Sequence, residues 1–154
     1  MSVDGKSVAP GPLRDGSFTL QAAPALTAAG KQYLRISGPE DAAAYAFDAQ
    51  VARWTASTPY SQIAPASSKF AAALGVSLQA DAQAHWPASA QAKVRSLIDD
   101  MRRLRDQLRS TRSRSAAGLA AWRAALTRET QADAVGSAED ALRRALKVPL
   151  VPVR

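Results

Sequence analysis

A run of apolar residues at alternating spacings of four and three positions constrains the fold of this chain more than any other feature. The run spans more than two heptads and consists of Ala90, Val94, Leu97, Met101, Leu104 and Leu108. This spacing places the apolar side chains on one stripe of an α-helix, which must be buried against other helices. Pro87 suits the beginning of that helix. The sequence therefore predicts helix-on-helix packing.

Three other segments carry weaker apolar stripes. A first helix is expected to begin at Pro39 and to end before Thr58-Pro59, because the residue before a proline is pushed out of the α region. A second is expected from about position 61–65 to Ala84. The residues of these two stripes are Ala44, Phe47, Val51 and Trp54 in the first, and Ile63, Phe70, Leu74 and Leu78 in the second.

The last helix is predicted from about Ser115 to Leu146. It has one stripe at Leu119, Trp122 and Leu126 and a displaced one at Val135, Leu142 and Leu146. Because the displacement falls near Gly136, we expect the helix to bend or split there. Two favourable i,i+4 ion pairs are also expected in this segment, Glu139–Arg143 and Asp140–Arg144.

Together these segments predict an all-α fold, an up-down antiparallel four-helix bundle, because short breaks favour antiparallel neighbours. The bundle domain is expected to span residues 39–154. Residues 1–38 mix Gly, Pro, Ser and Ala without a helical period. We interpret them as a flexible arm, with a short extended piece at about Ser17–Gln21.

Composition makes catalysis an unfavourable interpretation. The 154 residues include no Cys and one His, and they lack Gly-rich phosphate loops and metal-binding His motifs. His85 is interpreted as a corner residue, with a general base or metal ligand as the minor alternative. The carboxylate pairs Asp99/Asp100, Glu129/Asp133 and Glu139/Asp140 are interpreted as solvated faces with Arg partners. We expect no enzyme and no catalytic, cofactor-binding or metal site.

The charge distribution points to a surface instead. Residues 1–92 carry six basic and six acidic groups, whereas residues 93–154 carry 14 basic and seven acidic ones. One stripe beside the apolar seam of the third helix is a candidate surface for an anionic partner: Arg95, Arg102, Arg105, Arg109 and Arg112. The simplest alternative is a solubilising face whose Arg side chains pair across helices with Asp41, Asp48, Asp81 or Glu129. The other two are attraction to anionic lipid or an acidic envelope partner, and nonspecific nucleic-acid binding.

Five short segments of the chain follow one another in an order that is similar to that of a known family. They are YLRISGP at 33–39, Ala44 to Phe47, HWPASA at 85–90, AWRAAL at 121–126 and ALRRALKVP at 141–149. The arrangement resembles small actinobacterial secreted proteins and lipoproteins of unknown function, and the resemblance covers about residues 31–154. It implies a helical domain; its motifs are not chemical, so it carries over no catalytic residues and says nothing about activity.

The resemblance implies an extracytoplasmic, cell-envelope location. The first residues are not expected to act as a signal peptide, because no apolar block follows Lys6, and the chain has no Cys for lipidation. Our leading hypothesis is a non-enzymatic envelope protein that acts by binding or scaffolding, with an anionic membrane surface or an envelope protein as partner. The alternative is a cytoplasmic protein that binds nucleic acid nonspecifically through the same Arg stripe.

Overall fold

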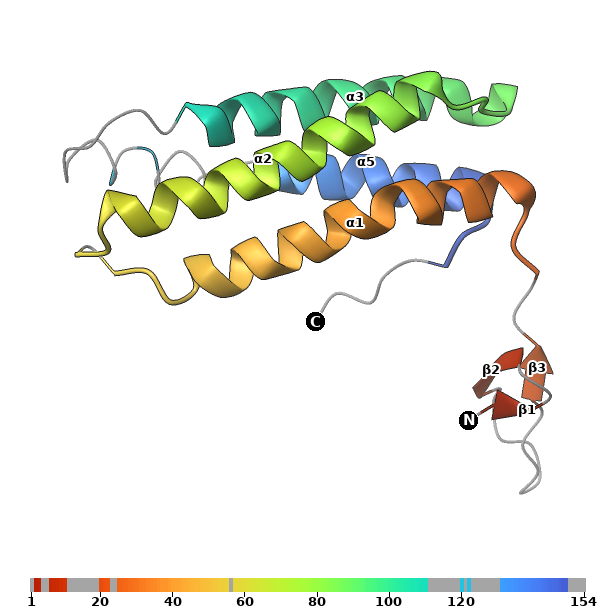
Figure 1. The fold of residues 1–154 in the computed structure, drawn as a ribbon. Helices are drawn as coiled ribbons and strands as arrows, with labels where there is room; N and C mark the ends of the chain where they lie inside the picture. Colours follow the sequence, from red (N-terminus) through yellow and green to blue (C-terminus); the bar gives the residue numbers. More distant parts are fainter. Residues whose placement is uncertain are drawn as a thin grey trace.

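The computed structural model describes the side chains of residues 25–55, 57–110, 120, 122 and 133–149, and the backbone alone at 2–3, 6–10, 20–22 and 131–132. Most of this described part forms four helices: α1 (Ala28–Val51), α2 (Tyr60–Gln83), α3 (Ala88–Arg109) and α5 (Gln131–Leu146). They run alternately up and down, side by side (Figure 1). The prediction of an all-α antiparallel four-helix bundle is confirmed.

The apolar stripes form the core of this bundle. All six predicted seam residues of α3 are buried, none with more than 4% of its surface exposed. In α2 the residues Ile63, Phe70, Leu74 and Leu78 are buried as well, and Val135, Leu142 and Leu146 are buried in α5. Burying a side chain of this size stabilises the fold by about 1.5–3 kcal/mol.

Aromatic rings fill the end of the bundle where α1 meets α2. The Phe47 ring lies 5.3 Å from that of Phe70 and 5.7 Å, edge to face, from that of Trp54. Trp54 in turn lies 6.4 Å from Trp122, whose indole Nε1 donates to the carbonyl of Gln107. This arrangement agrees with the core-filling role expected for these aromatic residues.

Helix α1 begins eleven residues earlier than predicted, so the expected start at Pro39, and with it the boundary of the helical domain, was wrong. The helix is capped by Thr27, whose hydroxyl accepts from the backbone N–H of Gly30 at 3.0 Å. Pro39 lies inside the helix, where a proline ordinarily costs about 3 kcal/mol. The buried face of α1 continues on both sides of it, through Tyr33 and Phe47, and this tertiary packing outweighs the local preference.

The C-terminus of α5 and the beginning of α1 hold each other in place. Val148 N–H donates to the Arg143 carbonyl at 2.9 Å and Lys147 N–H to the Arg144 carbonyl at 3.3 Å, a Schellman end with Lys147 at φ 57°. The Thr27 hydroxyl donates to the Leu146 carbonyl at 3.3 Å. Val148 is buried against Gly30.

Gly30→Ala is expected to destabilise the protein by about 1–2 kcal/mol, although alanine favours helices. A Cβ at this position would lie 2.9 Å from Val148 Cγ2 and 3.2 Å from the capping Thr27 Oγ1. Gly136→Ala is the matched control, because nothing lies within 4 Å of its Cβ position. The control should stabilise by about 1 kcal/mol in urea denaturation. A Gly30→Ala protein as stable as the wild type would contradict the close contact between Val148 and Gly30.

Near Gly136 a bend or a split of the last helix was expected, and a split at this residue does not occur. Helix α5 runs without interruption from Gln131 to Leu146, because Gly136 is exposed and neighbouring residues supply the packing on the opposite face. A glycine at such a position lowers helix stability without ending the helix. The part of this prediction that falls on 111–130 lies outside the described residues, except for helical Ala120 and Trp122.

The N-terminal arm, expected to be flexible, contains three short strands: β1 (Ser2–Val3), β2 (Lys6–Pro10) and β3 (Leu20–Ala22). They pair antiparallel in the order β1-β2-β3, with Val3 opposite Lys6 and Ala9 opposite Gln21. The extended piece expected at Ser17–Gln21 overlaps β3. The missed signal is Asp4-Gly5 between β1 and β2, a dipeptide typical of two-residue hairpins.

Candidate functional site

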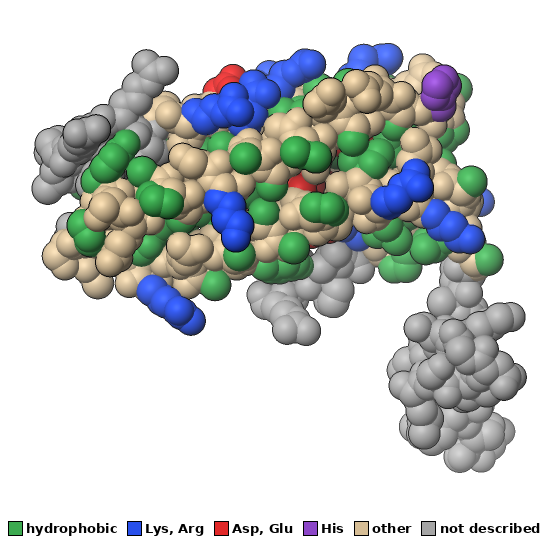
Figure 2. Space-filling model, in the orientation of Figure 1, with side chains coloured by type: hydrophobic (Ala, Val, Ile, Leu, Met, Phe, Trp, Pro, Cys, Tyr) green, Lys and Arg blue, Asp and Glu red, His purple; other side chains and the backbone are tan. Residues whose placement is uncertain are grey.

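The predicted Arg stripe lies on the outer side of α3, and we call Arg95, Arg102, Arg105 and Arg109 the α3 basic surface. Arg95, Arg102 and Arg109 are exposed, and Arg105 is partly buried. Arg112 lies outside the described residues. Figure 2 shows Lys and Arg side chains along this edge of the bundle, beside acidic ones.

Acidic residues of α3 itself neutralise part of this surface. Arg102 pairs with Asp99 at 3.0 Å, and Arg105 donates from Nε and Nη2 to Asp106 at 3.0 and 2.9 Å. Arg103, which the stripe does not include, pairs with Asp100 at 3.1 Å. In the described part of the chain, the interhelix pairs expected for the stripe are therefore replaced by pairs within α3. The Asp side chains of α3 lie closer to these guanidinium groups than carboxylates on other helices do, so they form the ion pairs.

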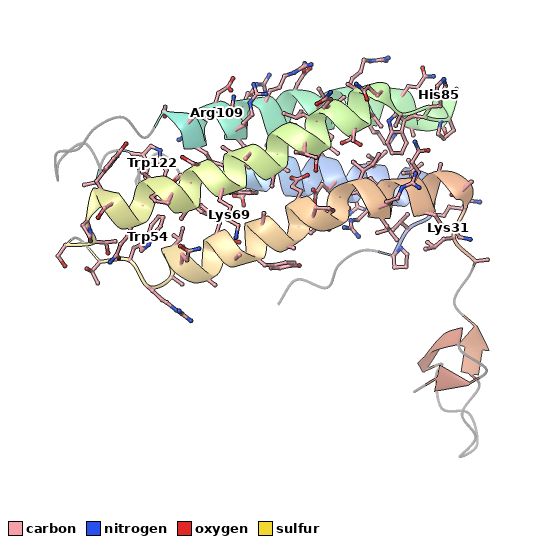
Figure 3. All side chains as sticks on the ribbon, viewed as in Figure 1. Lys31, Trp54, Lys69, His85, Arg109 and Trp122 are labelled. Carbon is pink, nitrogen blue, oxygen red and sulfur yellow. The ribbon has the colours of Figure 1, made fainter. Side chains whose placement is uncertain are left out.

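Two members of the surface keep an uncompensated charge. Within residues 25–110 and 133–149, no carboxylate lies in ion-pair distance of Arg95 or Arg109. The Arg109 Nη2 lies 4.0 Å from the Cβ position of Gly75 on α2, so this side chain extends over the neighbouring helix. Arg109 lies toward one end of the bundle and His85 toward the other (Figure 3).

Arg95 and His85 line a pocket of about 310 Å³ at the corner between α2 and α3. Its wall is fixed by Trp86, whose indole Nε1 donates to the Asp81 carbonyl at 2.9 Å. The pocket is lined by Asp81, Ala82, Ala84, His85, Trp86, Gln91, Val94, Arg95 and Ile98. Asp81 is buried whereas His85 is exposed, so the structure does not pair them. Helix α2 ends at Gln83, and His85 lies beyond its last turn.

The sequence analysis missed a group of polar residues between α1, α2 and α5, which we call the polar seam; all are buried except Asp41 and Glu139, which are partly buried. It consists of Tyr33, Ser37, Glu40 and Asp41 of α1, Ser77 and Asp81 of α2, and Glu139 and Arg143 of α5. Glu40 is 4% exposed, Asp81 3% and Arg143 4%. Charged side chains are rarely buried without partners, because removing them from water costs free energy, so their burial here has to be explained by their surroundings.

Arg143 is the cationic centre of the polar seam. Its Nη2 donates to Asp41 Oδ2 at 3.4 Å, its Nη1 donates to the Pro149 carbonyl at 3.4 Å, and its guanidinium lies 5.2 Å from the centre of the Tyr33 ring. The Ser37 hydroxyl donates to the same Asp41 oxygen at 3.4 Å. The ion pair expected between Glu139 and Arg143 is replaced by this contact with α1, whereas Asp140–Arg144 forms as predicted at 3.7 Å.

Burial raises the pKa of every carboxyl group in the polar seam. The pKa of Glu40 rises to about 8, first through desolvation and then through the charges of Glu139, Asp41 and Asp81. Desolvation and the Asp41 charge raise the pKa of Glu139 to about 7, and desolvation raises that of Asp81 to about 6. The pKa of Asp41 also rises through burial, although Arg143 opposes the shift. Near neutral pH, protons are therefore held within the seam.

Most residues of the polar seam continue the four-three spacing of the predicted apolar stripes, and this explains why they face the interior of the bundle. The apolar stripe of α1 at Ala44, Phe47 and Val51 extends backwards in the same four-three rhythm through Glu40, Ser37 and Tyr33. In α2 the rhythm passes through Ser77 and Asp81, and in α5 through Glu139. Each polar residue of this set occupies a position that points into the bundle.

The described residues form neither a metal site nor a membrane-spanning helix. No three carboxylate or imidazole side chains among them are arranged to hold a metal ion. None of the helices in the same part of the chain combines the length and apolar composition needed to cross a membrane.

Fold and site define an all-α four-helix bundle with a basic outer helix and a buried carboxyl-rich seam. No protein-family model, curated protein or solved structure matches the chain.

Proposed function

We propose that this chain is a non-enzymatic helical-bundle protein of the cell envelope that binds an anionic partner through the α3 basic surface. The observation that carries the proposal is that Arg95 and Arg109 lie on an exposed helix with no acidic partner among the described residues. Helix α3 has six Lys and Arg side chains against three Asp, so it remains net positive after its internal ion pairs form. An anionic membrane is the partner that such a surface fits best, at about 1 kcal/mol for each basic side chain near it.

The cell-envelope location is supported by the resemblance to actinobacterial secreted proteins and lipoproteins. A binding role agrees with the placement of the basic side chains, because they lie on a rigid helix whose opposite face is fixed in the core. A surface prepared in this way attracts a partner without ordering itself first.

The double substitution Arg95→Glu, Arg109→Glu is expected to weaken binding to anionic vesicles by roughly 30-fold or more. The vesicles consist of phosphatidylcholine with about one phosphatidylglycerol in three lipids. Reversing Arg105 would be less informative, because Asp106 already neutralises it. Lys31→Glu with Lys69→Glu is the matched control: it makes the same change in net charge at exposed residues of α1 and α2 (Figure 3). Sedimentation with vesicles measures the binding.

Equal loss in both double variants would reduce the effect to net charge and contradict a specific surface. Tighter binding to duplex DNA than to vesicles, with a steep loss between about 50 and 200 mM salt, would favour the nucleic-acid alternative instead.

A further inference from the structure

The contact between α1 and α5 differs from the other helix contacts of the bundle. Of the four neighbouring helix pairs, α1 and α5 have the least backbone contact. The other pairs meet through buried apolar residues such as Leu74, Leu97 and Met101. Apart from the contact of Thr27 and Gly30 with Leu146 and Val148 at its first turn, α1 meets α5 through the polar seam. The free energy that holds this one interface together therefore depends on charge more than on apolar burial.

Charges in the polar seam are out of balance. The seam holds four carboxyl groups, those of Glu40, Asp41, Asp81 and Glu139, and one guanidinium, that of Arg143, whose charge acts on Asp41 and Glu139. Asp140 lies at the edge and is paired with Arg144. On the α3 side, Arg95 and the preceding-turn residue His85 line the same pocket as Asp81 but form no ion pair with it, and the buried residues of α3 nearby are Ala90, Val94, Leu97 and Ile98. With every carboxyl group ionised, the seam would hold three uncompensated negative charges.

Two buried oxygens show independently that the seam is under-satisfied. Neither Asp81 Oδ1 nor the Tyr33 hydroxyl has a hydrogen-bond partner among the described residues, and both residues are at least 97% buried. A buried carboxylate oxygen without a partner is costly when charged and much less so when protonated.

We propose that protons in the polar seam hold α1 against α5, and that their loss loosens this interface while the α2–α3–α5 core stays packed. The protein would then have a closed state at mildly acidic pH and a loosened α1 at alkaline pH. The arrangement would act as a proton-operated latch built into the bundle.

The direction of the effect follows from the raised pKa values of the carboxyl groups. A carboxyl whose pKa is higher in the closed state than in the open state binds protons more tightly when closed. Closure is therefore fully favoured below the ordinary pKa of about 4.5 and is weakened as pH rises toward 8, the range between the ordinary and the closed-state pKa of Glu40. Glu139, with a pKa of about 7, and Asp81, with a pKa of about 6, act in the same direction.

Hydrogen exchange of the full chain at pH 5.5 and 8.5, corrected for the intrinsic rates, tests the proposal. Protection of residues 28–45 in α1 is expected to fall about tenfold or more relative to residues 90–108 in α3, since one pKa unit corresponds to a factor of ten. Glu40→Gln with Glu139→Gln, which mimics the protonated groups, should keep α1 protected at both pH values. Asp99→Asn with Asp106→Asn, at exposed carboxylates of α3, should behave like the wild type.

Equal changes of protection in α1 and α3 would overturn the proposal, because they would indicate global unfolding. Full pH dependence in the Glu40→Gln, Glu139→Gln protein would overturn it as well. If that variant does not fold, carboxyl-carbon NMR of the wild type decides the question. If Glu40 and Glu139 titrate below pH 5, the seam holds no protons near neutral pH and the proposal is wrong. If they titrate above pH 6, the proposal is supported.

Discussion

Replacing Arg143 with Met is expected to destabilise the bundle by about 3–5 kcal/mol at pH 8.5. The side chain of Arg143 is only 5% exposed, and it is the sole cation among the described residues of the polar seam. Its removal leaves the partly buried Asp41 without its ion pair and takes away the guanidinium that lies over the Tyr33 ring. Methionine keeps the length and apolar stem of the side chain, so the measured loss reflects the missing charge.

The same substitution should cost less at pH 5.5, because protonated carboxyl groups no longer need the guanidinium. Urea denaturation at the two pH values measures the difference. Arg144→Met is the control one position along α5: that side chain is 63% exposed and only loosely paired with Asp140, so we expect a change within about 0.5 kcal/mol at either pH. A cost for Arg143→Met that does not vary with pH would contradict the charge balance inferred for the seam.

Much of the bundle could be predicted from the sequence because apolar residues repeat at the helical period. The strongest stripe, in α3, predicted the beginning of the helix beside Pro87 and six of its seven buried residues, all except Ile98. The beginning of α1 could not be found in the same way, since a proline inside a helix and a proline at its first turn look alike in one sequence. Packing around Tyr33 and Phe47 decides between them.

The polar seam was harder to predict than the fold, although its residues lie on the same stripes. With the first helix expected to begin at Pro39, Glu40 falls in its first turn, where an acidic side chain suits the helix N-terminus and gives no reason to expect burial. Once α1 is extended back to Ala28, Glu40 falls on the buried face. Burial of a single carboxylate also depends on the facing helix, here on Glu139 and Arg143, and no local pattern specifies that partner.

The α3 basic surface shows what spacing along one helix can and cannot predict. The stripe of Arg side chains was placed on the outside of the bundle, and the described members lie there. The pairs within α3 cannot be read from spacing alone, because Asp99, Asp100 and Asp106 each have several basic neighbours within reach. The choice among them depends on rotamers and on burial, as with Arg105, which turns to its own neighbour Asp106.

The aromatic end of the bundle should respond quite differently from the polar seam. Phe47→Ala is expected to cost about 3–5 kcal/mol, because Phe47 is 4% exposed and its ring contacts both Phe70 and Trp54. No counter-charge is lost, so the cost should be the same at pH 5.5 and 8.5. Tyr45→Ala, at a side chain of α1 that is 64% exposed, is the control and should change stability by less than about 0.5 kcal/mol.

Measured together by urea denaturation, the Phe47 and Arg143 substitutions separate two sources of stability along one helix. Both contacts involve α1, one through its C-terminal half and the other through Tyr33 and Asp41 near its N-terminal half. If apolar burial stabilises the C-terminal half of α1 and proton-dependent charge balance stabilises its N-terminal half, only the cost of the Arg143 substitution will change with pH. A Phe47→Ala cost that rises as strongly with pH would mean that α1 responds as a single unit, and the division between the two halves would be wrong.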